Sequence, residues 1–480
     1  MKTLERHIRE SSLATLAGLL AHYALARLIG QGVLTEHIAE WIMAHTPNAW
    51  SVAILQSLGA WAKPAAVTGG LAALGFVLFL VDAAESHWLS GRWRKLPSLV
   101  ILTAAGAARI AGRESGLEFW VVGLLVLAWL QRRRLRQTVT PANRRQFLQH
   151  APLILVAGTA GVAVESWLRE RWRAQRAVRP VQLWNFRYPT ERESFAPGLV
   201  RKAITPVEAF YAMSKNTVDP VVDPMNWSLE ITAEGQLLRR WSYQELLTLP
   251  RIQRITTMRC ISNTLKSDLM GTAEWSGILL RQLIDPARLP SRFVEVAFIG
   301  ADGHDESLPA AYAFGDEVML ALGMNGWTLN RIHGFPLRVV APRYYGFKSV
   351  KWLKEIRFVS QPYLGTWPRM GYAKLPEIHT MSFIDRARPA GSRLQVGGVA
   401  FAGLRGIQRV EVRPGGGRWT VATLEPPLSP YSWVRWRAEV DASGASWLEA
   451  RAQDGLGQWQ ATDETPLFPS GVAGPTIKKL

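Results

Sequence analysis

Long apolar runs are confined to the first third of the chain, and this asymmetry limits the possible folds more than any other feature. Residues 1–168 are dominated by Leu, Ala, Val and Gly, whereas the remainder has frequent turn signals and ordinary polarity. A bilayer core of about 30 Å needs about 20 helical residues, so two of the early runs are long enough to span and two are short. We expect about four membrane helices over 1–140, at 13–30, 64–81, 98–112 and 117–131.

The formal charge of +18 is distributed as a membrane protein requires. Much of it flanks the apolar runs, as the positive-inside bias and anionic lipid head groups select. Four crossings would put the N-terminus and the two main basic loops on one side. Membrane lipid, and not nucleic acid, is the partner that this charge predicts. The basic segments are 92–95, 132–136, 144–145 and 169–179.

A fifth apolar run at 151–164 follows residues 143–149, Asn-Arg-Arg-Gln-Phe-Leu-Gln. This heptad resembles the twin-arginine export signal, although Asn143 replaces its Ser/Thr and Gln149 replaces its Lys. No small-x-small cleavage site follows, so we read 141–170 as a signal with a retained anchor helix, about five spans in all. The rest of the chain would then lie in the periplasm, on a multi-pass protein of the bacterial inner membrane. The alternative is one more basic cytoplasmic loop.

The second half mixes short strands with helices up to about residue 379. Runs at 227–231 and 293–299 alternate as strands do, and Ser242 with Glu245 predicts a capped helix over 242–249. Residues 275–284 read as an amphipathic turn or helix. We therefore predict an α+β domain over 171–379, with a linker or surface wrap at its start.

The chain after residue 380 reads as strands only, separated by Pro- and Gly-rich turns. This pattern predicts an all-β immunoglobulin-like sandwich over 380–480. The expected strands are 406–413, 419–424, 432–440 and 447–452.

Cys260 is the only cysteine among 480 residues, which excludes a disulfide scaffold. The neighbouring Arg259 would favour the thiolate, the form that binds metals and attacks electrophiles. The alternative is a buried thiol that serves as a small apolar residue.

Four blocks around this cysteine, taken together, resemble the sulfite oxidase family of molybdenum–pterin oxidoreductases. The resemblance covers 200–380, extends to 381–470 as the sandwich-type C-terminal domain of the family, and does not cover 1–140. The blocks are Arg-Cys-Ile-Ser-Asn at 259–263 with 271–280, Ala-Asp-Gly at 301–303, 324–327 running into His-Gly-Phe-Pro-Leu-Arg at 333–338, and 342–353.

The resemblance implies a molybdenum–molybdopterin cofactor with Cys260 as the thiolate ligand of the metal. It also implies catalytic roles for Tyr372, whose phenol would lie near the transferred oxygen, and for Arg259. Taken alone, the 333–336 block reads equally as a tight turn, and Lys348 and Lys351 as solvated charges. The implied cofactor-binding residues are Tyr211, Asn216, Asp302, His333, Arg338, Ser349, Val350 and Lys351.

One departure concerns the substrate. Sulfite-oxidising members have Arg and His where this chain has residues 213–215, Met-Ser-Lys. The arginine that helps to bind the oxyanion is missing there, and Arg259, Arg343 or Arg369 could replace it.

We therefore predict a membrane-tethered oxidoreductase that transfers oxygen to or from a small oxyanion, a sulfoxide or an N-oxide. The alternative is a non-catalytic binding or assembly protein that retains the fold. No Cys-x-x-Cys-His motif is present, so electrons would pass through a cytochrome or a quinone-linked protein. Three histidines in or near the apolar runs, His22, His87 and His150, are candidates for haem b, although structural pairing is the commoner use of such residues.

Overall fold

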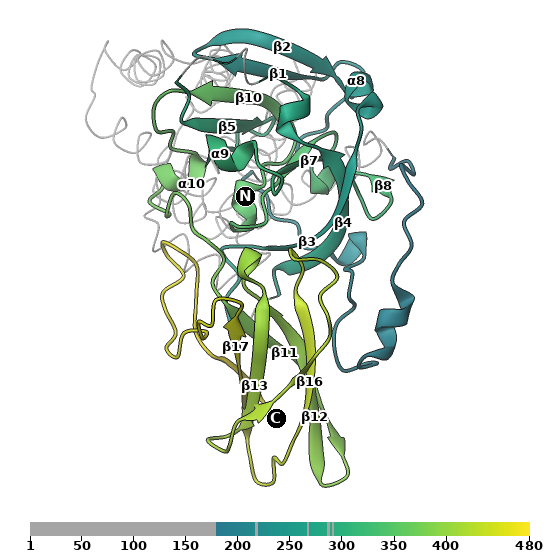
Figure 1. The fold of residues 1–480 in the computed structure, drawn as a ribbon, viewed down its shortest axis with the longest axis vertical. Coiled ribbons are helices and arrows are strands. Elements are labelled where there is room, and N and C mark those ends of the chain that lie inside the picture. Colours follow the sequence, from purple (N-terminus) through teal and green to yellow (C-terminus); the bar gives the residue numbers. More distant parts are fainter. Residues whose placement is uncertain (1–178, 217–218, 266–267, 286–288, 290–291) are drawn as a thin grey trace, which may run out of the picture. The chain divides into compact units, whose positions relative to one another are not determined.

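β-Strands, not helices, build the part of the chain that the structure describes (Figure 1). The structure is a computed structural model and describes residues 179–480 apart from 217–218, 266–267, 286–288 and 290–291. The membrane region predicted at 1–140 and the anchor predicted at 141–170 lie outside these residues. Within them, no helix is both long enough and apolar enough to cross a membrane.

The predicted fold class is wrong, because the described residues form a mostly-β architecture and not an α+β domain. Their helices are too short to build a layer. The segment 275–284 shows why, since its first residues belong to a strand with eight of nine residues buried. Such a strand is covered on both faces, and periodicity cannot distinguish it from a buried helix. The described helices are α8 (Tyr243–Thr248), α9 (Ala310–Ala313) and α10 (Thr366–Arg369), with 3-10 turns η2 (Thr190–Ser194), η3 (Val207–Ala209), η4 (Leu280–Gln282), η6 (Arg331–His333), η7 (Gly346–Lys348) and η8 (Gly403–Arg405).

The first sheet has the strand order β2-β1-β10-β5-β6. β1 and β10 are parallel and the other pairs are antiparallel. Glu234 and Gly235 join β1 to β2 with φ of 47° and 81°, as a type I′ hairpin turn requires. Ser242 and Glu245 then form the predicted capping box of α8. The strands are β1 (Ser228–Ala233), β2 (Gln236–Ser242), β5 (Glu295–Gly300), β6 (Asp305–Pro309) and β10 (Leu353–Val359).

The second sheet has the order β3-β4-β7-β8, with β9 paired to β7. One apolar core joins it to the first sheet, and Trp275, Phe298, Leu320 and Ile356 are fully buried there. Residues 181–184 lie along its β8 end, where Gln182 bridges Trp327. The strands are β3 (Ile252–Arg259), β4 (Met270–Ile278), β7 (Met319–Met324), β8 (Trp327–Thr328) and β9 (Arg338–Val340).

Two four-stranded sheets, β11-β12-β16-β15 and β14-β13-β17-β18, make up the C-terminal region. Their inner faces share a core around the fully buried Trp436. The strands expected after residue 406 are present, whereas no pattern had indicated the two between 381 and 401. The strands are β11 (Met381–Ala390), β12 (Arg393–Phe401), β13 (Ile407–Pro414), β14 (Thr420–Val421), β15 (Thr423–Leu424), β16 (Val434–Val440), β17 (Trp447–Asp454) and β18 (Thr476–Lys479).

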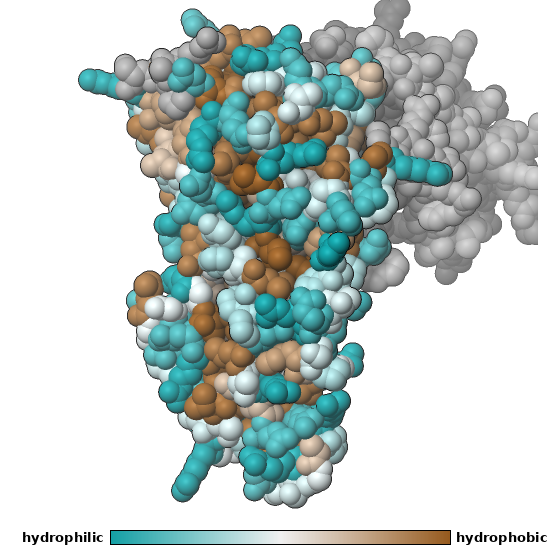
Figure 2. All heavy atoms as spheres, turned by 45° about the vertical axis from the view of Figure 1, so that its right-hand side comes forward, coloured by the Kyte–Doolittle hydropathy of each residue, from teal (hydrophilic) through white to brown (hydrophobic). Residues whose placement is uncertain are grey.

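The surface of the described residues is chemically mixed. Figure 2 shows, on one face, hydrophilic residues interspersed with several separate apolar patches. The most exposed large apolar side chains come from distant parts of the sequence, for example Met225, Leu364 and Leu456. Isolated exposed apolar side chains are ordinary on folded domains, so we assign no partner to them.

Candidate functional site

Cys260 lies directly after β3, in the loop that leads to β4, and is 8% exposed. The loop is held closed because Cys260 N donates to the Leu269 carbonyl at 2.9 Å and its carbonyl accepts from Asn263 N at 3.1 Å. Burial raises the pKa of the Cys260 thiol, while hydrogen bonds from Ser262 and Ile261 and the charge of Arg259 oppose that rise. Arg259 alone does not make the free thiolate the favoured form, contrary to expectation. The site provides hydrogen-bond donors to a thiolate sulfur. Because the sulfur is buried, a bound positive ion would stabilise the thiolate further.

Two tyrosines approach this sulfur from different elements. Burial, followed by the proximity of Cys260, raises the pKa of both Tyr211 and Tyr372. Tyr211 follows η3 and stacks on Phe210, with ring centroids 5.4 Å apart. A Cβ on Gly346 would collide with the Tyr211 hydroxyl, so only glycine lets η7 approach so closely. No described residue forms a hydrogen bond with either hydroxyl, which leaves both available to a ligand.

His333 and Arg338 come together through the turn between η6 and β9. His333 Nε2 lies 3.0 Å from the Val207 carbonyl, so Nε2 carries the proton and Nδ1 is an acceptor. Burial lowers the pKa of His333 to about 4 and keeps the ring neutral. Arg338 donates to the carbonyls of His333 and Ser349 at 3.1 and 3.2 Å. The 333–338 block is thus both a tight turn, with Gly334 at φ 103°, and part of the site.

The segment after η7, residues 349–351, packs against these groups. The Ser349 hydroxyl accepts from Ala341 N at 3.1 Å, and Val350 is buried in the core. Lys351 donates to the Ser214 hydroxyl and the Ile332 carbonyl, both at 2.9 Å. The expectation of a solvated charge is wrong for Lys348, which is fully buried. We call residues 346–351 the cofactor loop.

Asp302 lies in the β5–β6 turn, where its carboxylate accepts from His304 N at 3.0 Å. A Cβ on the preceding Gly300 would come within 2.6 Å of both Asp302 Oδ1 and the Lys351 carbonyl, so this turn lies against the cofactor loop. Asn216 lies in a bend next to residues 217–218, at an edge of the described residues. Its role stays a prediction.

Arg259 is the one candidate oxyanion-binding arginine that no described carboxylate neutralises. It is 1% exposed, its side-chain hydrogen bonds to described residues go to the carbonyls of His379, Asn263 and Val472 at 3.4–3.5 Å, and its Nε has no hydrogen-bond partner among those residues. Arg369 is paired with Asp305, and Arg343 lies 3.6 Å from Glu377.

These residues fit a molybdenum–pterin group by their donor chemistry. A thiol sits among hydrogen-bond donors, and two buried guanidinium groups, Arg259 and Arg338, have no described carboxylate partner. Burial lowers the pKa of Arg338 to about 10, because desolvation disfavours its charged form. An anionic phosphate would offset this desolvation cost. His333 Nδ1 and the Lys351 ammonium add an acceptor and a cation.

Sequence reasoning missed the aromatic and C-terminal neighbours of Arg259. Its guanidinium lies 5.5 Å from the Tyr345 ring centroid, and His379 N donates to the Tyr345 hydroxyl. Tyr345 stands inside the 342–353 block, which could have indicated it, whereas nothing in the local sequence marks His379 or Val472. A separate open hollow of about 620 Å³ lies between residues 198–202, β11 and β18 and contains none of the predicted site residues.

Sequence comparison with known proteins also indicates a molybdopterin-binding domain. A family model described as an oxidoreductase molybdopterin-binding domain matches residues 216–367. Sulfite oxidase of Arabidopsis thaliana is 28% identical over 340 residues, 56% of this chain and 85% of that protein. Sulfite oxidase of Gallus gallus is 29% identical over 340 residues, 59% and 74% of the two chains. The solved sulfane dehydrogenase SoxCD of Paracoccus pantotrophus is 22% identical, with a TM-score of 0.48, over 55% of this chain and 75% of that chain.

The site geometry and the sequence matches agree on the cofactor and on the class of protein. The chain is therefore an oxidoreductase that uses a molybdenum–pterin cofactor, and its residues 216–367 match a molybdopterin-binding domain in a region similar in sequence to sulfite oxidases.

Proposed function

We propose that this enzyme transfers an oxygen atom to or from a small oxyanion such as sulfite. The cofactor, held by Cys260, supplies the two-electron redox chemistry. The observation that carries the substrate class is Arg259, a buried guanidinium next to Cys260 that lacks a described carboxylate. An oxyanion would neutralise it, whereas a sulfoxide or an N-oxide bears no net charge and would leave a desolvated cation.

Two side chains would act on the substrate. Arg259 would bind its charge through a planar fork of donors. Tyr372 would donate a hydrogen bond to the transferred oxygen, because its hydroxyl is within electrostatic reach of Cys260 and no described residue occupies it. The Tyr345 ring supports the guanidinium from one face. A role as a non-catalytic binding protein finds no support in these groups.

Electron exchange and location are further parts of the proposal. We propose that electrons pass to a cytochrome or a quinone-linked protein, which the lack of a Cys-x-x-Cys-His motif supports. We also propose that the domain works in the periplasm, at the bacterial inner membrane, which the paired arginines at 144–145 support. A periplasmic reporter fused after Leu480 should be active, and activity of a cytoplasmic reporter in its place would contradict the export.

The substrate class is tested by a panel of sulfite, a sulfoxide and an N-oxide, assayed with artificial electron donors and acceptors. We expect turnover of the oxyanion and, in Arg259→Gln, a KM for it raised by about tenfold or more, since a charged hydrogen bond is lost. Arg343→Gln is the matched control and should leave this KM unchanged. Faster turnover of a neutral substrate by the wild type would contradict the oxyanion assignment.

A further inference from the structure

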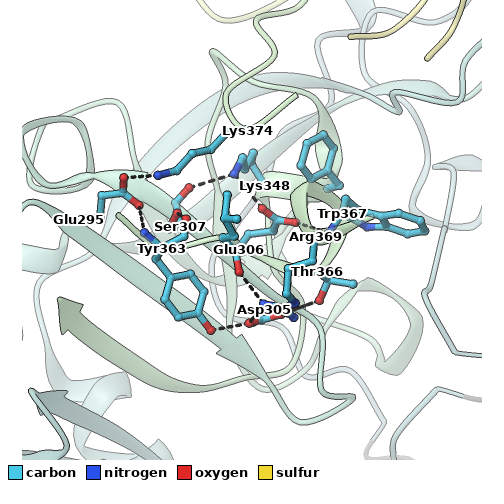
Figure 3. A network of polar contacts seen from close by, with 12 residues as sticks. Glu295, Asp305, Glu306, Ser307, Lys348, Tyr363, Thr366, Trp367, Arg369 and Lys374 are labelled. Carbon is cyan, nitrogen blue, oxygen red and sulfur yellow. Dashed lines mark hydrogen bonds and ion pairs between the residues drawn. The ribbon is translucent and has the colours of Figure 1, made fainter. Parts of the chain in front are cut away.

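A buried ion pair begins a network that leaves the cofactor loop and enters β6 (Figure 3). Lys348 Nζ lies 2.7 Å from Glu306 Oε2, and both side chains have 0% exposure. Lys348 also donates to the Ser307 carbonyl at 3.1 Å. Because Lys348 directly precedes the cofactor-binding residues 349–351, its ammonium fixes the loop to β6 at that point.

The same carboxylate reaches α10 with its other oxygen. Glu306 Oε1 accepts from Trp367 N, in the first turn of α10, at 3.1 Å. Gly365 makes this approach possible, since a Cβ there would come within 2.6 Å of Glu306 Oε2 and of the Asp305 carbonyl. Figure 3 shows Glu306 between Lys348 on one side and Trp367 on the other.

Asp305, the residue before Glu306, fixes the rest of the helix. Its carboxylate pairs with Arg369 and accepts from the hydroxyls of Thr366 and Tyr363. These bonds hold the pKa of Asp305 at about 2, against the desolvation caused by its burial. Both ends of α10 are therefore attached to Asp305, and its first turn is also attached to Glu306.

α10 in turn positions Tyr372. The Trp367 carbonyl accepts from Tyr372 N at 3.2 Å, and the two rings meet edge to face with centroids 5.6 Å apart. The peptide groups of Trp367 thus connect Glu306 to Tyr372, whose pKa the neighbouring Cys260 helps to raise. The path runs from the cofactor loop through Lys348, Glu306 and Trp367 to Tyr372.

Stability alone does not account for the buried pair. Burial raises the pKa of Glu306 and lowers the pKa of Lys348, so desolvation opposes both charges. Replacing such a pair with apolar groups of similar volume is often neutral for stability, whereas breaking it from one side is costly. A role in holding neighbouring segments in place explains the presence of the Glu306–Lys348 pair better.

We propose that Glu306 and Lys348 are positioning residues that hold the cofactor loop and Tyr372 in a fixed relation. The proposal rests on the cofactor assignment of residues 349–351 and not on the identity of the substrate. If the pair is broken, the metal and the tyrosine hydroxyl lose their alignment, while the donors that hold the cofactor remain.

The test compares Lys348→Met, Lys348→Arg and the double variant Glu306→Gln/Lys348→Met. Lys374→Met is the matched control, because it removes a lysine from the neighbouring ion pair with Glu295, which acts on Lys348 through its charges but forms no hydrogen bond with it. The readouts are molybdenum content, kcat and KM per bound molybdenum, the Mo(V) electron paramagnetic resonance spectrum, and hydrogen exchange of the 366–372 segment.

We expect Lys348→Met and the double variant to keep molybdenum but to lose kcat by about tenfold to a hundredfold, as small misplacements of reacting groups do. KM should change little, the Mo(V) spectrum should shift, and exchange at 366–372 should accelerate. Lys348→Arg should restore most of kcat, and Lys374→Met should behave as wild type.

Wild-type kcat and spectrum in both charge-removing variants, or equal losses in Lys374→Met, would overturn the proposal. If Lys348→Met does not fold, the double variant decides, because it removes both charges and keeps an acceptor for Trp367 N. A wild type inactive on oxyanions would contradict the proposed function only, since the spectrum and the exchange rates need no substrate.

Discussion

The burial and pairing of single side chains in this protein depend on residues that are distant in the sequence. The roles predicted for Cys260, His333 and Arg338 followed from the resemblance of four ordered sequence blocks to a known family. Glu306 was not, since its partner Lys348 lies 42 positions away and read as a solvated loop charge. Whether a lysine is solvated or buried depends on which strands the fold brings against it, and local sequence does not contain that information.

His333 should make stability dependent on pH. Its folded pKa of about 4 lies below the ordinary value of 6.5, because burial and the charges of Arg338 and Lys351 disfavour the imidazolium. The unfolded chain therefore binds a proton between pH 6.5 and 4 that the folded chain does not. The free energy of unfolding should be fully retained above pH 6.5 and should fall on acidification to pH 4, by on the order of 3 kcal/mol.

Urea unfolding at several pH values checks this dependence. His333→Gln should flatten the dependence of the free energy of unfolding on pH between pH 4 and 6.5. Above pH 6.5, this free energy should change little with pH in either protein. An unchanged slope in the variant would show that other groups cause the acid sensitivity.

At the scale of elements, close approach of the cofactor loop to Tyr211 depends on Gly346. The Tyr211 hydroxyl is the neighbour that requires a glycine at this position. The amphipathic turn or helix expected at 275–284 was wrong for residues 275–278, because a strand covered on both faces loses the alternation that marks strands. The turn is present further on, as η4.

Gly346→Ala should displace the loop, since the added Cβ would collide with the Tyr211 hydroxyl and approach the Arg259 carbonyl at 3.4 Å. Overpacking of this kind costs about 1–3 kcal/mol. We expect a lower thermal midpoint and a lower molybdenum content. Gly303→Ala, in a turn where the added Cβ would meet nothing within 4 Å, is the steric control, although its φ of 76° adds backbone strain of its own. Equal molybdenum content in Gly346→Ala and wild type would contradict the close approach.

At the scale of the described fold, the C-terminal sandwich completes the edge of the strand that carries the site. Thr257 N donates to the Tyr431 carbonyl at 2.9 Å, and Trp433 N donates to Thr257 Oγ1 at 2.8 Å. β3 is an edge strand of its sheet, so these bonds cover groups that would otherwise be unpaired. No local pattern in β3 predicts this contact, because its partner is about 175 residues away along the chain.

Two adjacent threonines allow a matched test of this contact. Thr257→Val leaves a buried Trp433 N–H without its acceptor and should lower the free energy of unfolding by about 1–3 kcal/mol. Thr256 is equally buried, but its hydroxyl has no partner among the described residues, so Thr256→Val should be neutral or stabilising. Chemical denaturation of the two variants decides, and similar losses in both would contradict the role of the Trp433 bond.

The central claim is that the Cys260 sulfur binds the molybdenum. X-ray absorption at the molybdenum edge tests it most directly, with wild type compared to Cys260→Ser, which keeps the size of the side chain. We predict that the metal environment of the variant contains one sulfur fewer and that the molybdenum content falls, while circular dichroism shows a retained fold. Identical sulfur coordination in the two proteins would contradict the account.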